Sequence, residues 1–131
     1  MSLVVDSSVL VAATVDEGSE GLWAEQTLGH NTLAAPQLVL VEATNILRRL
    51  ELANQLTLLE ASTARQDLLG LDIVLFPFAP LAGRIWELRA NVTCYDAWYV
   101  ALAETLDVPL ATLDRRLSKA PGPACRFMLP D

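Results

Sequence analysis

Histidine and cysteine are scarce in this sequence. Among its 131 residues there is one histidine, His30, and there are two cysteines, Cys94 and Cys125. A single histidine excludes most Ser–His and Cys–His nucleophilic schemes. Two cysteines can build neither a disulfide framework nor a four-thiolate zinc site. We therefore expect both cysteines to be small, mostly buried apolar residues in a reducing compartment.

Long apolar segments are also missing. A membrane-spanning helix needs about 18 consecutive apolar residues, and the richest stretch here, 73–81, is interrupted by Pro77 and Pro80. A secretory signal is not expected, because Asp6 interrupts the first apolar run and the first basic residue is Arg48. We expect a cytoplasmic protein without a membrane partner.

Basic residues are outnumbered by acidic ones. The chain has 9 Lys and Arg against 16 Asp and Glu, which gives a net charge of −7. This balance excludes a generic basic coat for nucleic acid or anionic membranes. It does not exclude a nucleic-acid enzyme, because a site built from carboxylates and divalent cations would contribute part of the negative charge itself.

Apolar residues are plentiful, at 53% of the chain, and they suffice for the core of one domain spanning 1–131. Short apolar runs alternate with longer segments of helical periodicity. The expected strands are 3–5, 32–35, 73–76, 109–111 and, at an edge, 124–129; the expected helices are 9–15, 20–28, 36–50, 57–69, 80–89, 93–106 and a short one ending at 119. This alternation predicts an α/β domain with a mostly parallel sheet and helices on both faces.

Two aspartates each follow an apolar strand pattern. Asp6 comes directly after 3–5, and Asp114 ends the segment 108–114. The carboxyl ends of parallel strands form the edge where α/β sheets bind ligands. Each aspartate could instead cap the helix that follows it, and this alternative stays open. If the two strands were neighbours, the carboxylates would repel each other unless a cation or a proton lay between them.

Two further acids lie on expected helices. Glu42 is on or beside the apolar stripe of 36–50, where an ionised carboxylate is costly without a partner, unless the stripe is rotated and the carboxylate reaches its edge. Asp96 follows Thr93 at capping-box spacing, so capping alone would account for it. Taken with Asp6 and Asp114, these acids suggest a site for Mg²⁺ or Mn²⁺ rather than zinc, because no usable histidine or cysteine accompanies them. A pair of such ions can activate water and stabilise the leaving oxygen of a phosphodiester.

Four segments resemble the motifs of the PIN-domain ribonucleases, and they are 4–8, 42–47, 95–103 and 112–114. The size and the layout of these motifs are most similar to the VapC toxins of bacterial type II toxin–antitoxin pairs. The resemblance implies a PIN-like three-layer α/β/α fold with about five strands, in which the first and fourth strands are neighbours. It also implies a metal-dependent endoribonuclease that hydrolyses RNA, usually tRNA or rRNA, with Mg²⁺ or Mn²⁺.

The same resemblance implies a role for each motif residue. Asp6 and Asp96 correspond to the principal metal ligands. Glu42 and Asp114 correspond to the acids that complete the pocket and position metal-bound water, and Thr112 to the polar residue that supports the pocket. Where some relatives carry another acid or amide after the last aspartate, this chain has arginines, which implies a second metal site that is weak or that forms only with substrate.

Partners follow from the resemblance as well. It implies an RNA substrate, a cognate antitoxin that lays a segment with an arginine or lysine across the acidic pocket, and a second copy of the chain in a homodimer. Candidate anchors for protein contacts are Trp23, Trp86, Trp98 and the segment 76–78, with core packing favoured for Trp98. Candidate phosphate contacts, each of which could equally be a solvated surface charge, are Arg48, Arg49, Arg89, Arg115 and Arg116.

Other classes stay open at the level of the residues. A non-catalytic protein-binding module would use the four acids as helix caps. A phosphoacceptor domain is disfavoured because its usual lysine is missing, Lys119 near the terminus being the only lysine. A phosphatase with a nucleophilic aspartate is disfavoured because Asp6 has no second aspartate two residues later.

Overall fold

A five-stranded sheet forms the centre of the computed structural model, which describes residues 1–131. The strands are β1 (Ser2–Val5), β2 (Thr32–Pro36), β3 (Ile73–Phe76), β4 (Leu110–Ala111) and β5 (Phe127–Met128). Their order is β3-β2-β1-β4-β5 and every pair is parallel. The predicted α/β class is confirmed, and so is the expectation that the first and fourth strands are neighbours.

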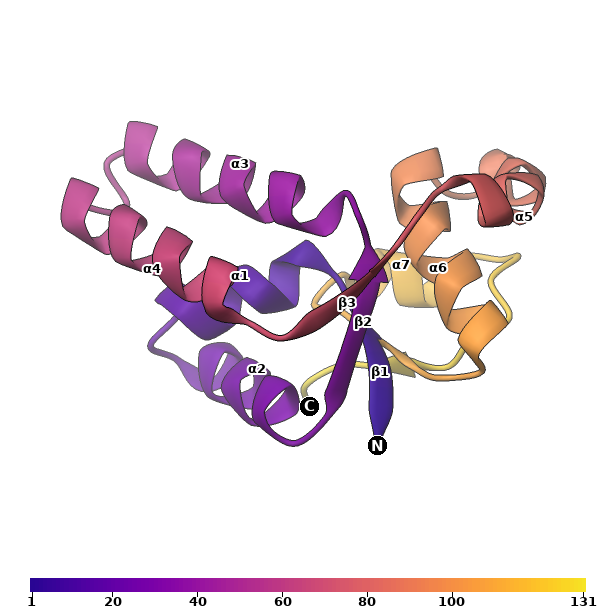
Figure 1. Ribbon diagram of the computed structural model, residues 1–131, viewed down its shortest axis with the longest axis horizontal. Helices are drawn as coiled ribbons and strands as arrows, with labels where there is room; N and C mark the ends of the chain where they lie inside the picture. The colour runs from indigo at the N-terminus through magenta and orange to yellow at the C-terminus, as the bar shows by residue number, and fades with distance from the viewer.

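Helices cover both faces of this sheet (Figure 1). One side carries α1 (Ser7–Val15), α2 (Ser19–Gly29), α3 (Val39–Leu52) and α4 (Leu58–Gly70). The other side carries α5 (Ala82–Glu87), which has a 3₁₀ turn at each end, and α6 (Cys94–Leu106), and α7 (Arg115–Lys119) links β4 to β5. None of these helices is long and apolar enough to cross a membrane.

The central strand explains why the layers close around the sheet. Leu3, Val4 and Val5 of β1 are all fully buried. A strand that is covered on both faces has no polar side to present, so its sequence reads as a continuous apolar run. The same burial extends along β4, where Leu110 and Ala111 are also inaccessible to solvent. The core therefore lies on both sides of β1 and β4, and the residues that follow these two strands are held by it.

Two boundaries differ from the sequence-based prediction. Pro36 does not open a helix: it is the last residue of β2 and pairs with Phe76, and α3 begins only at Val39. The ladder continues past the proline, because the Gln37 N–H donates to the Phe76 carbonyl at 3.0 Å. The predicted final strand 124–129 is also shorter, with two paired residues at the sheet edge. Prolines on either side, at 121, 123 and 130, leave little room for a longer ladder.

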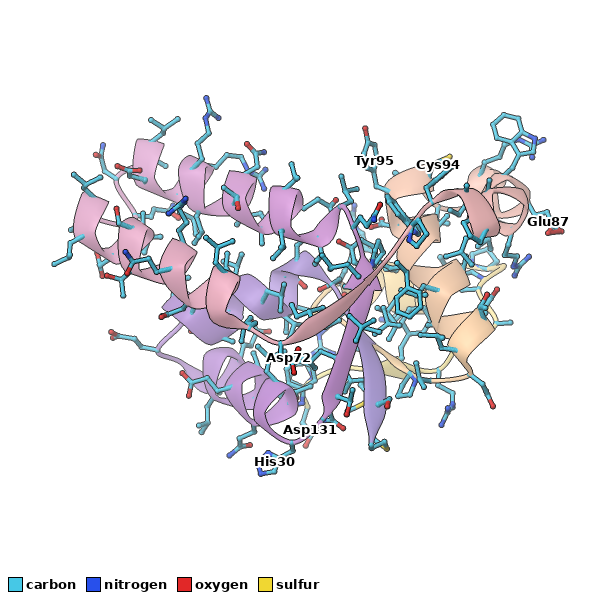
Figure 2. The ribbon with its side chains drawn as sticks, viewed as in Figure 1. His30, Asp72, Glu87, Cys94, Tyr95 and Asp131 are labelled. Carbon is cyan, nitrogen blue, oxygen red and sulfur yellow. The ribbon has the colours of Figure 1, made fainter.

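The expected burial of both cysteines is wrong for Cys94. Cys94 is exposed, whereas Cys125 is partly buried. Figure 2 shows the reason, since Cys94 and Tyr95 lie at the end of α6 that extends beyond the strands. The expected packing of Trp98 is confirmed, because its ring meets Phe78 edge-on at 5.5 Å and packs against the core.

The turn between α1 and α2 depends on Gly21. A Cβ at this position would lie 1.9 Å from the backbone carbonyl oxygen of Asp16, whereas a Cβ at Gly83 in α5 meets nothing within 4 Å. Gly21→Ala is therefore expected to lower the free energy of unfolding by roughly 2–3 kcal/mol, because the backbone itself must move. Gly83→Ala, the matched control, should be neutral or stabilising by up to about 1 kcal/mol. Urea denaturation of both variants measures the difference, and equal effects would contradict the clash.

Candidate active site

The candidate site begins where β1 and β4 end side by side. Val5 pairs with Ala111, and the Asp6 N–H donates to the Ala111 carbonyl at 3.2 Å. In the sheet, β2 and β3 lie on one side of β1, and β4 and β5 lie on its other side. Such a reversal of strand order is the place where open α/β sheets bind ligands. Asp6 and Thr112 are the first residues after the two strands at this point.

Asp6 is nearly buried and accepts hydrogen bonds on both carboxylate oxygens. One oxygen accepts from the Ser8 hydroxyl at 2.5 Å and from the Val9 N–H at 3.3 Å, and the other accepts from the Thr112 hydroxyl. Burial raises the pKa of Asp6 to about 6, although these hydrogen bonds act in the opposite direction. The alternative that Asp6 is a helix cap is also confirmed, since it is the N-cap of α1. One carboxylate therefore caps the helix and lies at the strand edge.

Thr112 joins the first aspartate to the last. Its fully buried hydroxyl donates to Asp6 and accepts from the Asp114 N–H at 2.9 Å. Asp114 is the N-cap of α7 and accepts from the Arg116 and Leu117 N–H groups at 3.0 and 3.1 Å. The cap alternative thus holds for this residue as well. The supporting role that the resemblance implied for Thr112 stays a prediction.

Ser8 makes a second link of the same kind, and sequence reasoning missed it. Its hydroxyl donates to Asp6 and accepts from the Leu113 N–H at 3.2 Å. The available signal was a serine two residues after an aspartate at a helix start, a position from which a hydroxyl readily bonds to its local neighbours. Its second partner comes from 105 residues away and could not be read from that local pattern.

Glu42 lies beside the apolar stripe of α3, as predicted, next to the buried Val39 and Ala43. It is half-buried, and its carboxylate accepts a hydrogen bond from the hydroxyl of Tyr99 on α6. Burial raises the pKa of Glu42, the nearby charge of Asp96 raises it further, and the Tyr99 hydrogen bond opposes the rise. Tyr99 is the second residue that sequence reasoning missed.

Asp96 stands in the first turn of α6. Thr93 caps this helix, because the Asp96 N–H donates to the Thr93 hydroxyl at 3.1 Å, but the reciprocal bond of a capping box is absent. Burial raises the pKa of Asp96, and the charge of Asp114 adds to the effect. Capping accounts for the backbone of Asp96 and leaves its carboxylate near other acids.

Charge effects link three of the four acids directly, and Asp6 acts with two of them on the Tyr99 hydroxyl. Asp96 is within electrostatic reach of Glu42 and of Asp114. The pKa of Tyr99 is raised by burial first, and then by Glu42, by Asp6 and by Asp96. No arginine or lysine neutralises any of the four, since the one salt bridge of the chain joins Arg84 to Glu104 elsewhere. This is a shared region of unneutralised negative charge.

The donor set suits a hydrated magnesium or manganese ion better than an all-protein cage. No three acidic, histidine or cysteine side chains converge closely enough to hold a metal ion between them. Magnesium usually keeps several waters and binds through only one or two carboxylates, so it does not require three converging side chains. Glu42 and Asp96, whose pKa values are each raised by a neighbouring carboxylate, would also gain from a nearby cation.

The predicted phosphate contacts are not drawn into the site. The Arg115 guanidinium donates to the Pro130 carbonyl at 2.9 Å, and Arg89 stacks over the Trp86 ring at 4.1 Å. Arg48 on α3 and Arg116 on α7 are exposed and form no salt bridge. Their contact with RNA stays a prediction.

Comparisons with known proteins identify the relatives of this chain. The chain matches the PIN domain family over residues 3–123. It is 39% identical over 127 residues to Ribonuclease VapC1 of Mycobacterium tuberculosis (strain ATCC 25618 / H37Rv), covering 96% of each chain. Its fold is similar to that of PAE2754 from Pyrobaculum aerophilum, with a TM-score of 0.71, 25% identity and coverage of 97% of this chain and 83% of that chain.

A further structural relative is VapBC-5 from Mycobacterium tuberculosis, a member of the VapBC family of toxin–antitoxin systems. It aligns with a TM-score of 0.58 and 22% identity over 98% of both chains. The match to a ribonuclease over nearly the full length of both chains sets aside the binding-module, phosphoacceptor and phosphatase alternatives. The chain therefore belongs to the PIN-domain family and, within it, to the VapC ribonuclease toxins of toxin–antitoxin systems.

Proposed function

We propose that the chain, as one PIN-like domain over residues 1–131, hydrolyses phosphodiester bonds of tRNA or rRNA with Mg²⁺ or Mn²⁺. The carboxylates of Asp6, Glu42, Asp96 and Asp114 would form the catalytic site. The observation that carries this proposal is the absence of any basic partner for these acids, at the reversal of strand order. VapC-type nucleases are generally metal-dependent, and the oxygen-only donor set favours Mg²⁺ or Mn²⁺.

Each side chain has a distinct part in this proposal. Asp6 and Asp96 would hold the ion, and the hydroxyls of Ser8 and Thr112 would keep the Asp6 carboxylate in one orientation. Glu42 and Asp114 would accept hydrogen bonds from water and orient it toward the phosphorus. A bound divalent ion supplies Lewis acidity for the phosphoryl oxygens and the departing sugar oxygen.

Charge also guides the proposals about partners. A site rich in carboxylates would accept the arginine or lysine of an antitoxin segment, which would occupy the place of the cation. We extend the proposal to a cognate antitoxin, to a homodimer and to action in the cytoplasm, as the family resemblance implies. Arg48, Arg115 and Arg116 would contact RNA phosphates outside the acidic centre, where they do not neutralise it.

Removal of the metal is expected to abolish cleavage. The purified chain should cut RNA with Mg²⁺ or Mn²⁺, lose at least about 100-fold in rate with excess chelator, and recover when the metal is restored, because the ion stabilises charge that develops in the transition state. Asp96→Asn should lose activity with the metal present, and Asp67→Asn on the exposed face of α4 should not. Electrophoresis of labelled RNA measures both results. Cleavage that survives the chelator and Asp96→Asn would rule out this site.

A further inference from the structure

The hydroxyl of Tyr99 has a single partner in the molecule. The side chain is 2% exposed and packs in the core of α6, where phenylalanine would bury the same ring. Its O–H donates to the Glu42 carboxylate, and no other hydrogen bond to this hydroxyl is present. A buried polar group without a partner is costly, so the hydroxyl depends on Glu42. Packing alone does not explain a tyrosine at this position.

The dependence is mutual. The Glu42 side chain is bonded to Tyr99 alone and forms no salt bridge. Its surroundings are electrostatically unfavourable, because it is half-buried and Asp96 is close. A neutral donor on one carboxylate oxygen restricts the rotation of that group and leaves the other oxygen available. Tyr99 is therefore the protein group that orients Glu42.

Tyr99 also ties Glu42 to Asp96. The two residues Asp96 and Tyr99 are three positions apart on α6, a spacing that places side chains on the same helix face. Glu42 comes from α3, 57 residues earlier than Tyr99 and on the opposite side of the sheet. One face of α6 thus presents one acid and holds another acid in place.

We propose that Tyr99 is a positioning residue of the ribonuclease site, which fixes the Glu42 carboxylate relative to Asp96 for the divalent ion and its water. The inference rests on the proposed function, and it adds a residue that contacts neither RNA nor metal. It acts through Glu42. Partners that orient the groups around a bound metal typically change metal affinity or activity by about 10- to 100-fold when they are removed.

The test compares Tyr99→Phe with wild type, and then the same change with E42Q as the starting protein. RNA cleavage is measured with Mg²⁺, and metal binding is measured with Mn²⁺ alone. Tyr99→Phe is expected to lower kcat by about 10-fold or more and to weaken Mn²⁺ binding by a similar factor, with the KM for RNA nearly unchanged. In the E42Q background, the same Tyr99→Phe change should have almost no further effect. Tyr95→Phe removes an exposed hydroxyl from the same helix and is the matched control, expected to behave as wild type.

Three results would contradict the positioning role of Tyr99 or the proposed function. Wild-type kcat and Mn²⁺ affinity in Tyr99→Phe, or equal losses with and without E42Q, would overturn the positioning role while leaving the proposed function intact. A wild-type chain that neither cleaves RNA nor binds Mn²⁺ would overturn the proposed function and this inference with it. If thermal unfolding shows that Tyr99→Phe is not folded, Tyr99→His and Tyr99→Leu replace it. The imidazole N–H can still donate to Glu42, so the histidine variant should keep more Mn²⁺ affinity than the leucine variant, and equal losses would overturn the positioning role.

Discussion

Asp6→Asn is expected to abolish RNA cleavage and, at the same time, to stabilise the fold at neutral pH. The loss of rate follows from removing a negative charge from the proposed metal site, where one well-placed electrostatic contribution is worth about 10²- to 10³-fold. The gain in stability follows from burial, because it costs free energy to ionise this carboxylate, whose pKa is raised to about 6. The amide carries no charge, and its oxygen can still accept on one side, but its NH2 group cannot accept, so one of the hydrogen bonds from the Ser8 and Thr112 hydroxyls is lost and reduces the net gain.

The size and the pH range of this stabilisation follow from linkage. The ordinary pKa of 3.8 applies to the unfolded chain, and the value of about 6 applies to the folded one. Between these two values the folded state binds more protons, so the stability of the wild type falls as the pH rises from about 4 to about 6. The full difference corresponds to an upper limit of about 3 kcal/mol. Asp6→Asn lacks this pH-dependent loss of stability. The difference in free energy of unfolding between the variant and the wild type should therefore grow from about pH 4 to about pH 6 and stay constant at higher pH.

Chemical denaturation at pH 4, 5, 6 and 7 measures this prediction without RNA. Asp67→Asn, at an exposed position on α4, is the matched control and should show no such trend. Adding Mg²⁺ should then narrow the gap between the two proteins, because only a wild-type site that binds the ion gains stability from it. A variant that is less stable than wild type at pH 7, or that still cleaves RNA, would contradict the assignment of Asp6.

Leu102→Ala is expected to cause the largest loss of stability among the substitutions considered. Leu102 is 1% exposed and lies on α6, the helix that contacts β1, β2 and β4. Removal of a buried leucine side chain costs about 2–5 kcal/mol, from lost apolar burial and from the cavity that remains. In a chain of this size, such a loss should lower the Tm by about 10 °C or more.

Leu106→Ala provides the matched control for this effect. Leu106 is the last residue of the same helix, one turn later, and it is 37% exposed. Because solvent can fill the space that its side chain leaves, the same substitution should cost less than about 1 kcal/mol. Thermal unfolding followed by circular dichroism compares the two variants. Similar Tm values would show that α6 is not anchored to the sheet through Leu102.

Local sequence patterns predicted the places of some of these residues and not of others. The positions of Asp6 and Asp114 at the sheet edge could be predicted because each follows an apolar run, and a residue after a parallel strand lies at the ligand-binding edge. Their capping roles could also be predicted, because each aspartate precedes an expected helix, and the structure contains both caps. The exposure of Cys94 could not be predicted from the sequence, because it depends on how far α6 extends beyond the strands.

The sequence by itself determined the alternation of strands and helices, the class of the sheet and the positions of four acids, because apolar periodicity and strand ends are properties of neighbouring residues. Only the tertiary structure decided which hydroxyls hold these acids. Thr112 meets Asp6 across 106 residues, and Tyr99 meets Glu42 across 57. These pairs exist because β1 lies beside β4 and because α3 and α6 approach the same end of the sheet, and that proximity is created by packing of the whole core rather than by any local signal.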